Sequence, residues 1–166
     1  LDEREEELAL EVMRSGRLSL GPMIDRFEEE VAEVVGAPYA AAVSSGTAGL
    51  HLLCVVAGVQ PGDEVITSPY SFVASANCAI YEGATPVFAD IDARTLNLDP
   101  AAVEAAITPR TRAIVAVDIF GYPSEIEVLQ EIASKSDLVL IDDSCEALGA
   151  RYRGRPLGAQ GQDAVF

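Results

Sequence analysis

The stretch LVLIDDSCEALG, residues 138–149, decides how the rest of the sequence is interpreted. Its first four residues are apolar and predict a strand that is buried on both faces of a parallel sheet. Asp142 and Asp143 follow directly, and ligands of open α/β sheets bind beyond the carboxyl ends of the strands. Side chains alternate across a strand, so one carboxylate is expected to face a ligand while the other packs or caps a turn. The spacing does not decide which, and both could instead cap the next turn, where Asp is common.

Outward from this stretch, strands and helices alternate from residue 36 to the end of the sequence. The predicted strands cover residues 40–43, 64–67, 86–91, 111–117, 138–141 and 163–166, and residues 149–158 suit a hairpin. The predicted helices cover residues 48–58, 72–79, 100–107 and 126–134. This alternation predicts an α/β fold, a largely parallel sheet with helices on both faces.

Two amphipathic helices are predicted ahead of this region, over residues 1–15 and 23–35, where apolar residues recur at helical spacing. Gly16 and Gly36 follow them at the positions where glycine commonly ends a helix. We therefore expect an amino-terminal helical segment, residues 1–35, and a large domain, residues 36–166.

Composition and charge exclude several function classes. The 166 residues are 49% hydrophobic, which is typical of a globular protein with a sizeable core. The formal net charge of −16, from 27 acidic and 11 basic residues, disfavours nucleic acid and anionic membranes as partners. No apolar run is long enough for a transmembrane span, and the acidic start at residues 2–7 is no signal peptide.

The cysteines and the single histidine give no metal or disulfide pattern. Cys54, Cys78 and Cys145 are scattered and odd in number, so they form neither a disulfide framework nor a zinc motif. His51 stands alone on a predicted helix, so no metal site is expected. A reduced, cytoplasmic setting is the natural interpretation.

Two further features point to a ligand. The segment SSGTA, residues 44–48, ends a strand and opens a helix, and Gly46, Thr47 and Ala48 would let a phosphate approach free backbone N–H groups. It is neither a Walker A loop nor GxGxxG, and an ordinary N-cap explains it equally well. Phe72 opens a helix just after a strand, where an aromatic ring can lie flat on a heteroaromatic ligand, although such a residue is more often core.

Together, a phosphate-type loop, an aromatic side chain and a carboxylate at a strand end outline one pocket. It would suit a phosphorylated heteroaromatic ring with a basic nitrogen. Pyridoxal 5'-phosphate (PLP) has these features, because its phosphate needs donors, its ring a stacking partner and its nitrogen an acidic neighbour.

At this point the sequence resembles a known family, the PLP-dependent nucleotide-sugar aminotransferases of the DegT or StrS type, which have the aspartate aminotransferase fold. The resemblance runs from Gly16 to Phe166, and it is carried by the order and spacing of residues 45–48, 62–66, 86–92 and 142–149. It implies that Gly46, Thr47 and Ala48 hold the cofactor phosphate, that Phe72 stacks on the ring and that Asp143 bonds the pyridine nitrogen.

The resemblance also implies a reaction and partners. The expected reaction moves an amino group, from glutamate, to a keto sugar linked to a nucleotide, and the expected assembly is a homodimer. Two other readings stay open. Some relatives carry histidine in place of the catalytic lysine and act as sugar dehydratases, and a non-catalytic dinucleotide module of Rossmann type is an alternative of another class.

The sequence departs from the family at three places. Glu146 stands where the family often has Gln or His near the cofactor's phenolic oxygen, so it is expected to contact the cofactor or the substrate. Asp118 replaces a frequent histidine, and any role there lapses. The Schiff-base lysine of the family is expected beyond Phe166, as is the small domain, so we expect a truncated large domain; the single lysine, Lys135, is given no chemical role.

Overall fold

The computed structural model describes residues 2–158, 160 and 162–166. The chain divides into two compact units, Leu1–Ala42 and Val43–Phe166. Among the described residues, no helix is both long and apolar enough to cross a membrane.

The first unit consists of two helices, α1 (Glu3–Ser15) and α2 (Pro22–Val35). The side chain of Asp2 caps α1 in a reciprocal arrangement with Glu5, which satisfies two backbone donors at the helix start. Pro22 occupies the first turn of α2, where its missing N–H costs nothing. Gly36 ends α2 with φ of 70°, a left-handed conformation that favours glycine. Both predicted helices are confirmed within two residues at each end.

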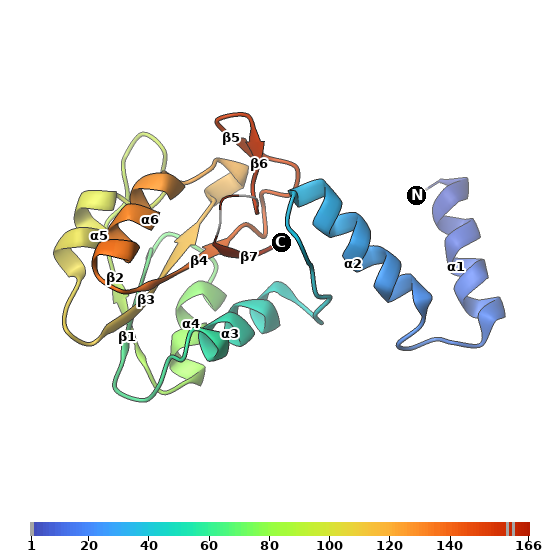
Figure 1. Ribbon diagram of the computed structural model, residues 1–166, viewed down its shortest axis with the longest axis horizontal. Coiled ribbons are helices and arrows are strands. Elements are labelled where there is room, and N and C mark those ends of the chain that lie inside the picture. The colour runs from blue at the N-terminus through green and yellow to red at the C-terminus, as the bar shows by residue number, and fades with distance from the viewer. Residues whose placement is uncertain (1, 159, 161) are drawn as a thin grey trace. The chain divides into compact units, whose positions relative to one another are not determined.

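The second unit is built on a five-stranded sheet in the order β2-β1-β3-β4-β7, and every neighbouring pair is parallel (Figure 1). The strands are β1 (Glu64–Thr67), β2 (Thr85–Phe88), β3 (Thr111–Val117), β4 (Val139–Asp143) and β7 (Asp163–Val165). The helices of this unit are α3 (Gly46–Val56), which precedes β1, and α4 (Ala74–Tyr81), α5 (Pro100–Ala106) and α6 (Ile126–Lys135), with a short 3-10 turn, η1 (Ile119–Gly121).

Alternating side chains of the central strands pack into two separate hydrophobic cores, one on each face of the sheet. Val65, Val115 and Ile141 pack with α3 and α4, whereas their chain neighbours Ile66 and Leu140 pack with α5 and α6. The sheet is therefore covered by helices on both faces, as predicted from the continuous apolar runs. The α/β fold expected from the sequence is confirmed.

One predicted strand is wrong. Residues 40–43 form no strand, and Val43 is exposed. A run of three alanines has low strand propensity, and apolar character alone does not supply a partner strand. The acidic pair after residue 141 differs in a smaller way, since Asp142 and Asp143 lie inside β4 instead of after it.

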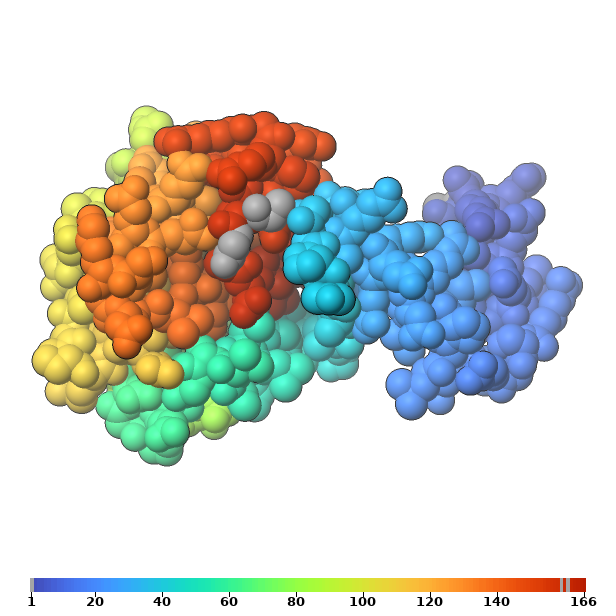
Figure 2. Space-filling model, in the orientation of Figure 1, coloured from blue at the N-terminus to red at the C-terminus, as the bar shows by residue number. Residues whose placement is uncertain are grey.

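The predicted hairpin is present as β5 (Arg151–Tyr152) and β6 (Arg155–Pro156), which pair antiparallel. Arg153 and Arg155 both form ion pairs with Glu127 on α6, at 2.7 Å for Arg155. Figure 2 shows this carboxyl-terminal segment packed along α6, in agreement with those pairs. These ion pairs hold the hairpin against α6, and the chain continues from the hairpin to β7.

Candidate ligand site at the carboxyl end of the sheet

A cavity of about 340 Å³ opens where β1, β3 and β4 end. Its wall consists of Pro69, Tyr70, Ser71, Phe72, Val117, Asp118, Ile119, Phe120, Asp143, Cys145 and Glu146. These residues come from the three segments that follow those strands, which is the edge where parallel α/β sheets bind ligands. The volume is in the range of small-molecule pockets, roughly 300–1,000 Å³.

Asp143 is the buried carboxylate of this cavity, with 6% of its surface exposed. It shares a face of β4 with Ile141, so it points toward α3 and α4. Ser75 on α4 donates a hydrogen bond from its hydroxyl to Oδ2 of Asp143 at 2.7 Å. Asp142 points to the opposite face and is fully buried. The alternation therefore brings Asp143, and not Asp142, to the cavity, the assignment that the family resemblance implied.

The amino-terminal end of α3 lies beside this carboxylate. A Cβ atom on Gly46 would stand 2.6 Å from Sγ of Cys145, closer than real Cβ contacts allow. Cys145 in turn lines the cavity, and its N–H donates to Oδ1 of Asp143 at 3.4 Å. A larger residue at position 46 would force Cys145 to shift, because the helix start and the segment after β4 touch there.

The donors at this helix start are unequally available. Ser45 caps α3 by accepting a hydrogen bond from the N–H of Ala48 at 3.2 Å. The N–H groups of Gly46 and Thr47 belong to the first helical turn, which has no acceptor inside the helix. They are therefore free to bind an anion at the positive end of the helix dipole. The capping role and the anion-binding role coexist, since they use different N–H groups.

Aromatic rings form the outer wall of the cavity. Phe72 and Phe120 are 74% and 73% exposed, unusually high values for side chains of that size. Tyr70 packs edge-on against Phe120 with ring centroids 6.4 Å apart. Phe72 is thus a surface ring and not a core residue, and it is free to stack on a planar ligand.

Glu146 and Asp118 also line the cavity. Glu146 accepts a hydrogen bond at Oε2 from the N–H of Phe120 at 2.9 Å, so it holds the turn after β3. Asp118 is buried and accepts from the N–H of Ser124 at 2.7 Å and from the hydroxyl of Ser144 at 2.8 Å. The sequence analysis gave Asp118 no role, but the structure makes it a polar anchor of this turn.

The ionisable groups of the cavity are acidic. Burial and a hydrogen bond with Asp143 raise the pKa of the Cys145 thiol to about 12, which leaves it protonated and unreactive at neutral pH. Burial raises the pKa of Asp118 above the ordinary carboxyl value. The cavity therefore offers negative charge near the sheet and positive helix-dipole charge at the start of α3.

This arrangement fits a planar ring that carries both a protonated nitrogen and an anionic group. The nitrogen would meet Asp143, the ring would lie against Phe72, and the anion would meet the N–H groups of Gly46 and Thr47. The close contact of Gly46 with Cys145 places the start of α3 against a residue that lines the cavity. The structure thus brings together the predicted residues Gly46, Thr47, Ala48, Phe72, Asp143 and Glu146 around the ends of α3, β1 and β4.

Ser75 was missed from the sequence. No local signal marks it, because α4 carries a second polar residue, Asn77, and the partner of Ser75, Asp143, is 68 positions away in the chain.

A family model described as the DegT/DnrJ/EryC1/StrS aminotransferase family matches residues 1–166. GDP-perosamine synthase of Caulobacter vibrioides is 44% identical over 167 residues, which cover 100% of this chain and 45% of the relative. A UDP-2-acetamido-2-deoxy-3-oxo-D-glucuronate aminotransferase of Pseudomonas aeruginosa is 43% identical over 144 residues, or 87% of this chain and 40% of the relative.

Solved structures agree with these sequence relatives. The Streptococcus pneumoniae protein Spr1654 in its PLP form has a TM-score of 0.89 and 32% sequence identity, with 94% of this chain and 44% of that chain covered. The chain therefore spans less than half the length of the relatives that it matches.

Proposed function

Since the chain belongs to the DegT/DnrJ/EryC1/StrS aminotransferase family, we propose that its cavity binds PLP and that the protein aminates a keto sugar linked to a nucleotide. The observation that supports this most is the buried carboxylate of Asp143, aligned by Ser75 between the start of α3 and the exposed ring of Phe72. The relatives named as GDP-perosamine synthase and as an oxo-glucuronate aminotransferase favour amination over the dehydratase alternative.

Each cavity residue has a role in this proposal. Gly46 and Thr47 bind the phosphate through backbone N–H groups, and Ala48 keeps that turn in place through its bond to Ser45. Phe72 covers one face of the ring. Asp143 keeps the pyridine nitrogen protonated, because an adjacent negative charge favours the cationic form. When bound, PLP supplies an electron sink for the negative charge that develops on the substrate carbon.

Glu146 has a separate role from the residues that would hold the phosphate and the ring. Its carboxylate accepts the N–H of Phe120, so it sets the position of the aromatic wall. One oxygen of this exposed residue remains available to a hydroxyl group of the cofactor or the substrate. We propose that Glu146 contacts one of these two partners.

The remaining parts of the proposal concern partners and setting. We propose glutamate as the amino donor, a lysine outside this chain as the amine that holds the cofactor, and a homodimer as the assembly. Leu52, Val55 and Val56 on α3 are exposed apolar side chains that suit a subunit contact. Free Cys54 and Cys78 suit a reducing, cytoplasmic compartment.

The direct test uses the full-length protein with PLP, glutamate and a nucleotide-linked keto sugar. Formation of the amino sugar and of 2-oxoglutarate, in equal amounts by mass spectrometry, is expected. Binding of NAD without binding of PLP would instead support the dinucleotide module.

Ser75→Ala is expected to weaken PLP binding about 10- to 150-fold, because a hydrogen bond to a charged group contributes about 1.5–3 kcal/mol. Titration of PLP into the full-length variant, followed by absorbance, measures the dissociation constant. Ser134→Ala, on the exposed side of α6, is the matched control and leaves affinity unchanged. Equal affinities in both variants would contradict the role of Ser75.

Lys135→Gln is expected to leave activity and the PLP adduct unchanged. Lys135 ends α6, is 70% exposed and lies 3.9 Å from Glu131, a surface pair that contributes at most about 0.5 kcal/mol. It also lies next to the amino end of β4, whereas the cavity lies at the carboxyl end. Borohydride reduction followed by peptide mapping would contradict this placement if it found stoichiometric labelling of Lys135.

A further inference from the structure

A second polar cluster lies on the other face of β4, directly beneath the cavity. Asp142 is fully buried there, and Asp118 is 1% exposed. Ala116 pairs with Asp142 across β3 and β4, and Asp118 follows directly after β3, where its side chain bonds Ser144, two residues after Asp142. Two buried carboxyl groups on neighbouring strands cannot both be ionised without a large cost in free energy.

The hydrogen bonds of Asp118 identify it as the ionised member. Its Oδ1 accepts from the backbone N–H of Ser124, and its Oδ2 accepts from the hydroxyl of Ser144. A backbone N–H is always a donor, so Oδ1 carries no proton. With both oxygens accepting, Asp118 is an anchored carboxylate.

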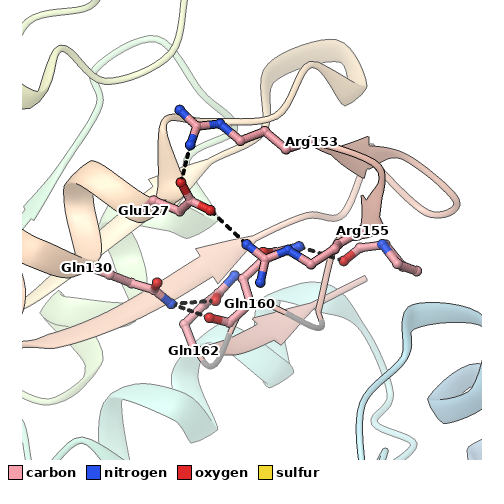
Figure 3. Close-up of polar contacts among 7 residues, drawn as sticks. Glu127, Gln130, Arg153, Arg155, Gln160 and Gln162 are labelled. Carbon is pink, nitrogen blue, oxygen red and sulfur yellow. Dashed lines mark hydrogen bonds and ion pairs between the residues drawn. The ribbon is translucent and has the colours of Figure 1, made fainter.

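Hydrogen bonds between amide groups fix the orientation of Gln162, the partner of Asp142, and Figure 3 shows those from Gln130 to Gln160 and Gln162. The Nε2 of Gln130 donates to the backbone carbonyl of Gln160 at 2.7 Å, and a carbonyl accepts only. The same nitrogen donates to Oε1 of Gln162 at 3.0 Å, which leaves the amide nitrogen of Gln162 facing Asp142. That nitrogen donates to Oδ2 of Asp142 at 2.9 Å, so this oxygen is an acceptor.

The other carboxyl oxygen of Asp142, Oδ1, still needs a hydrogen-bond partner. It is enclosed, and within the described residues it has no hydrogen-bond partner. The hydroxyl of Ser144 lies nearby and also acts on Asp142, but its hydrogen is donated to Asp118. A proton on this oxygen turns an orphaned acceptor into a donor. The neighbouring acceptor is Asp118, which is bonded to Ser144, two residues after Asp142, and is close enough for the two carboxyl groups to act on each other.

We propose that Asp142 is a positioning residue that stays protonated and donates a hydrogen bond from Oδ1 to the carboxylate of Asp118. Asp118 anchors Ser124 and Ser144, and its own N–H donates to the carbonyl of Asp143 at 3.0 Å. The shared proton therefore holds together the turn that carries Phe120 and the strand end that carries Asp143. This proposal deepens the proposed function, because it concerns the support of the same cofactor site.

The charges that face Asp142 agree with this placement of the proton. Burial and the negative charge of Asp118 raise the pKa of Asp142 to about 8, and Asp143 on the same strand adds to the effect. The other groups that act on Asp142 are the uncharged side chains of Gln162, from the approach to β7, and of Ser144, while Gln130 on α6 contacts Gln162. Because the folded-state pKa is raised, stability that depends on the proton is present at low pH and is lost as pH rises through about 8.

The first experiment needs no variant. Infrared spectra of the full-length protein with ¹³C-labelled aspartate are expected to show the carbonyl stretch of an un-ionised carboxyl group at neutral pH, and to lose it near pH 8. Asp142→Asn removes that band, whereas Asp137→Asn, an exposed residue in the turn before β4, retains it. Absence of the band from the unsubstituted protein at neutral pH would overturn the proposal.

The second experiment measures the support of the site. The amide of Asn at position 142 can donate to Asp118 and accept from Gln162, so Asp142→Asn is expected to fold and to bind PLP. The Asp137→Asn control keeps the titrating Asp142. Above the pH at which Asp142 loses its proton, the PLP affinity of this control, divided by that of Asp142→Asn, is expected to fall up to about tenfold per pH unit. The titration of PLP itself cancels in this ratio. Asp142→Ala, which cannot donate, is expected to bind PLP weakly at every pH.

The two experiments distinguish a failure of the Asp142 proposal from a failure of the proposal that the cavity binds PLP. A constant affinity ratio between pH 7 and pH 10, or full PLP affinity in Asp142→Ala, would overturn the positioning role. If neither Asn variant bound PLP, the cofactor assignment would fail, and the infrared band would still decide whether Asp142 holds the proton.

Discussion

Asp143→Ala is expected to lower kcat of the full-length protein about 100- to 1,000-fold, the effect of removing one preorganised electrostatic group from an active site. The physical reason is the loss of the negative charge that keeps the pyridine nitrogen protonated. Without it, PLP withdraws fewer electrons from the substrate carbon. The measurement is the initial rate of amino-sugar formation at saturating glutamate and keto sugar.

The protein is expected to remain folded, so the loss of activity is specific. Ser75, which loses its partner, has the hydroxyl of Ser71 at 2.8 Å and the carbonyl of Phe72 at 3.2 Å as alternatives. Removing the charge of Asp143 also removes one of the causes that raise the pKa of Asp142, so the protonated Asp142 is not disturbed at neutral pH. The unfolding midpoint is therefore expected to change little.

Asp143→Asn separates charge from hydrogen bonding. The amide still accepts from Ser75, but it carries no charge, so the rate is expected to fall nearly as far as in Asp143→Ala. Asp137→Asn is the control for the substitution itself, since it is exposed and its backbone φ of 55° suits Asn. Near-full activity in Asp143→Asn would contradict the proposal that Asp143 contacts the ring nitrogen.

The sequence was sufficient for the fold wherever local signals agreed with one another. The apolar run at residues 138–141 and its Asp pair placed β4 and the ligand edge, because an uninterrupted apolar run fits only a strand covered on both faces. Asp99 and Pro100 marked the start of α5, where the Asp99 side chain accepts the N–H of Ala101 at 2.9 Å. Residues 40–43 were misread because alanine favours no strand by itself.

The site was less predictable, because its geometry depends on contacts between distant segments. Spacing alone left Asp142 and Asp143 equivalent, and only the register of β4 in the sheet shows which face each occupies. Asp118 was set aside as a departure from the family, yet it meets Ser144, 26 positions later in the chain. Such pairs have no local signature in the sequence, since neither partner constrains the residues next to the other.

Gly46→Ala is expected to weaken PLP binding about 10- to 100-fold, which corresponds to the roughly 1–3 kcal/mol cost of overpacking a close contact. The new Cβ would stand 2.6 Å from Sγ of Cys145, so Cys145 must move, and its N–H contact to Asp143 moves with it. Titration of PLP into the full-length variant measures this loss.

Helix propensity cannot explain such a loss. Gly46 has no positive φ, and alanine inside a helix is favoured over glycine by about 1 kcal/mol. An intrinsic backbone effect would therefore stabilise Gly46→Ala, opposite in sign to the expected steric effect. Urea unfolding and PLP binding are measured on the same variant to separate these two effects. The gain in helix propensity is expected in the free energy of unfolding, whereas the steric contact at the first turn is expected in PLP affinity.

The decisive comparison is the double variant Gly46→Ala with Cys145→Ala. Without Sγ, the next atom of residue 145 is Cβ, and the Cβ on position 46 would lie 3.9 Å from it, an ordinary contact. Cys145→Ala alone is expected to bind PLP normally, because its thiol is protonated and unreactive. The double variant is then expected to recover most of the affinity, with a coupling energy of about 1–3 kcal/mol in the mutant cycle. Additive losses would show that residue 46 affects PLP through something other than its contact with Cys145.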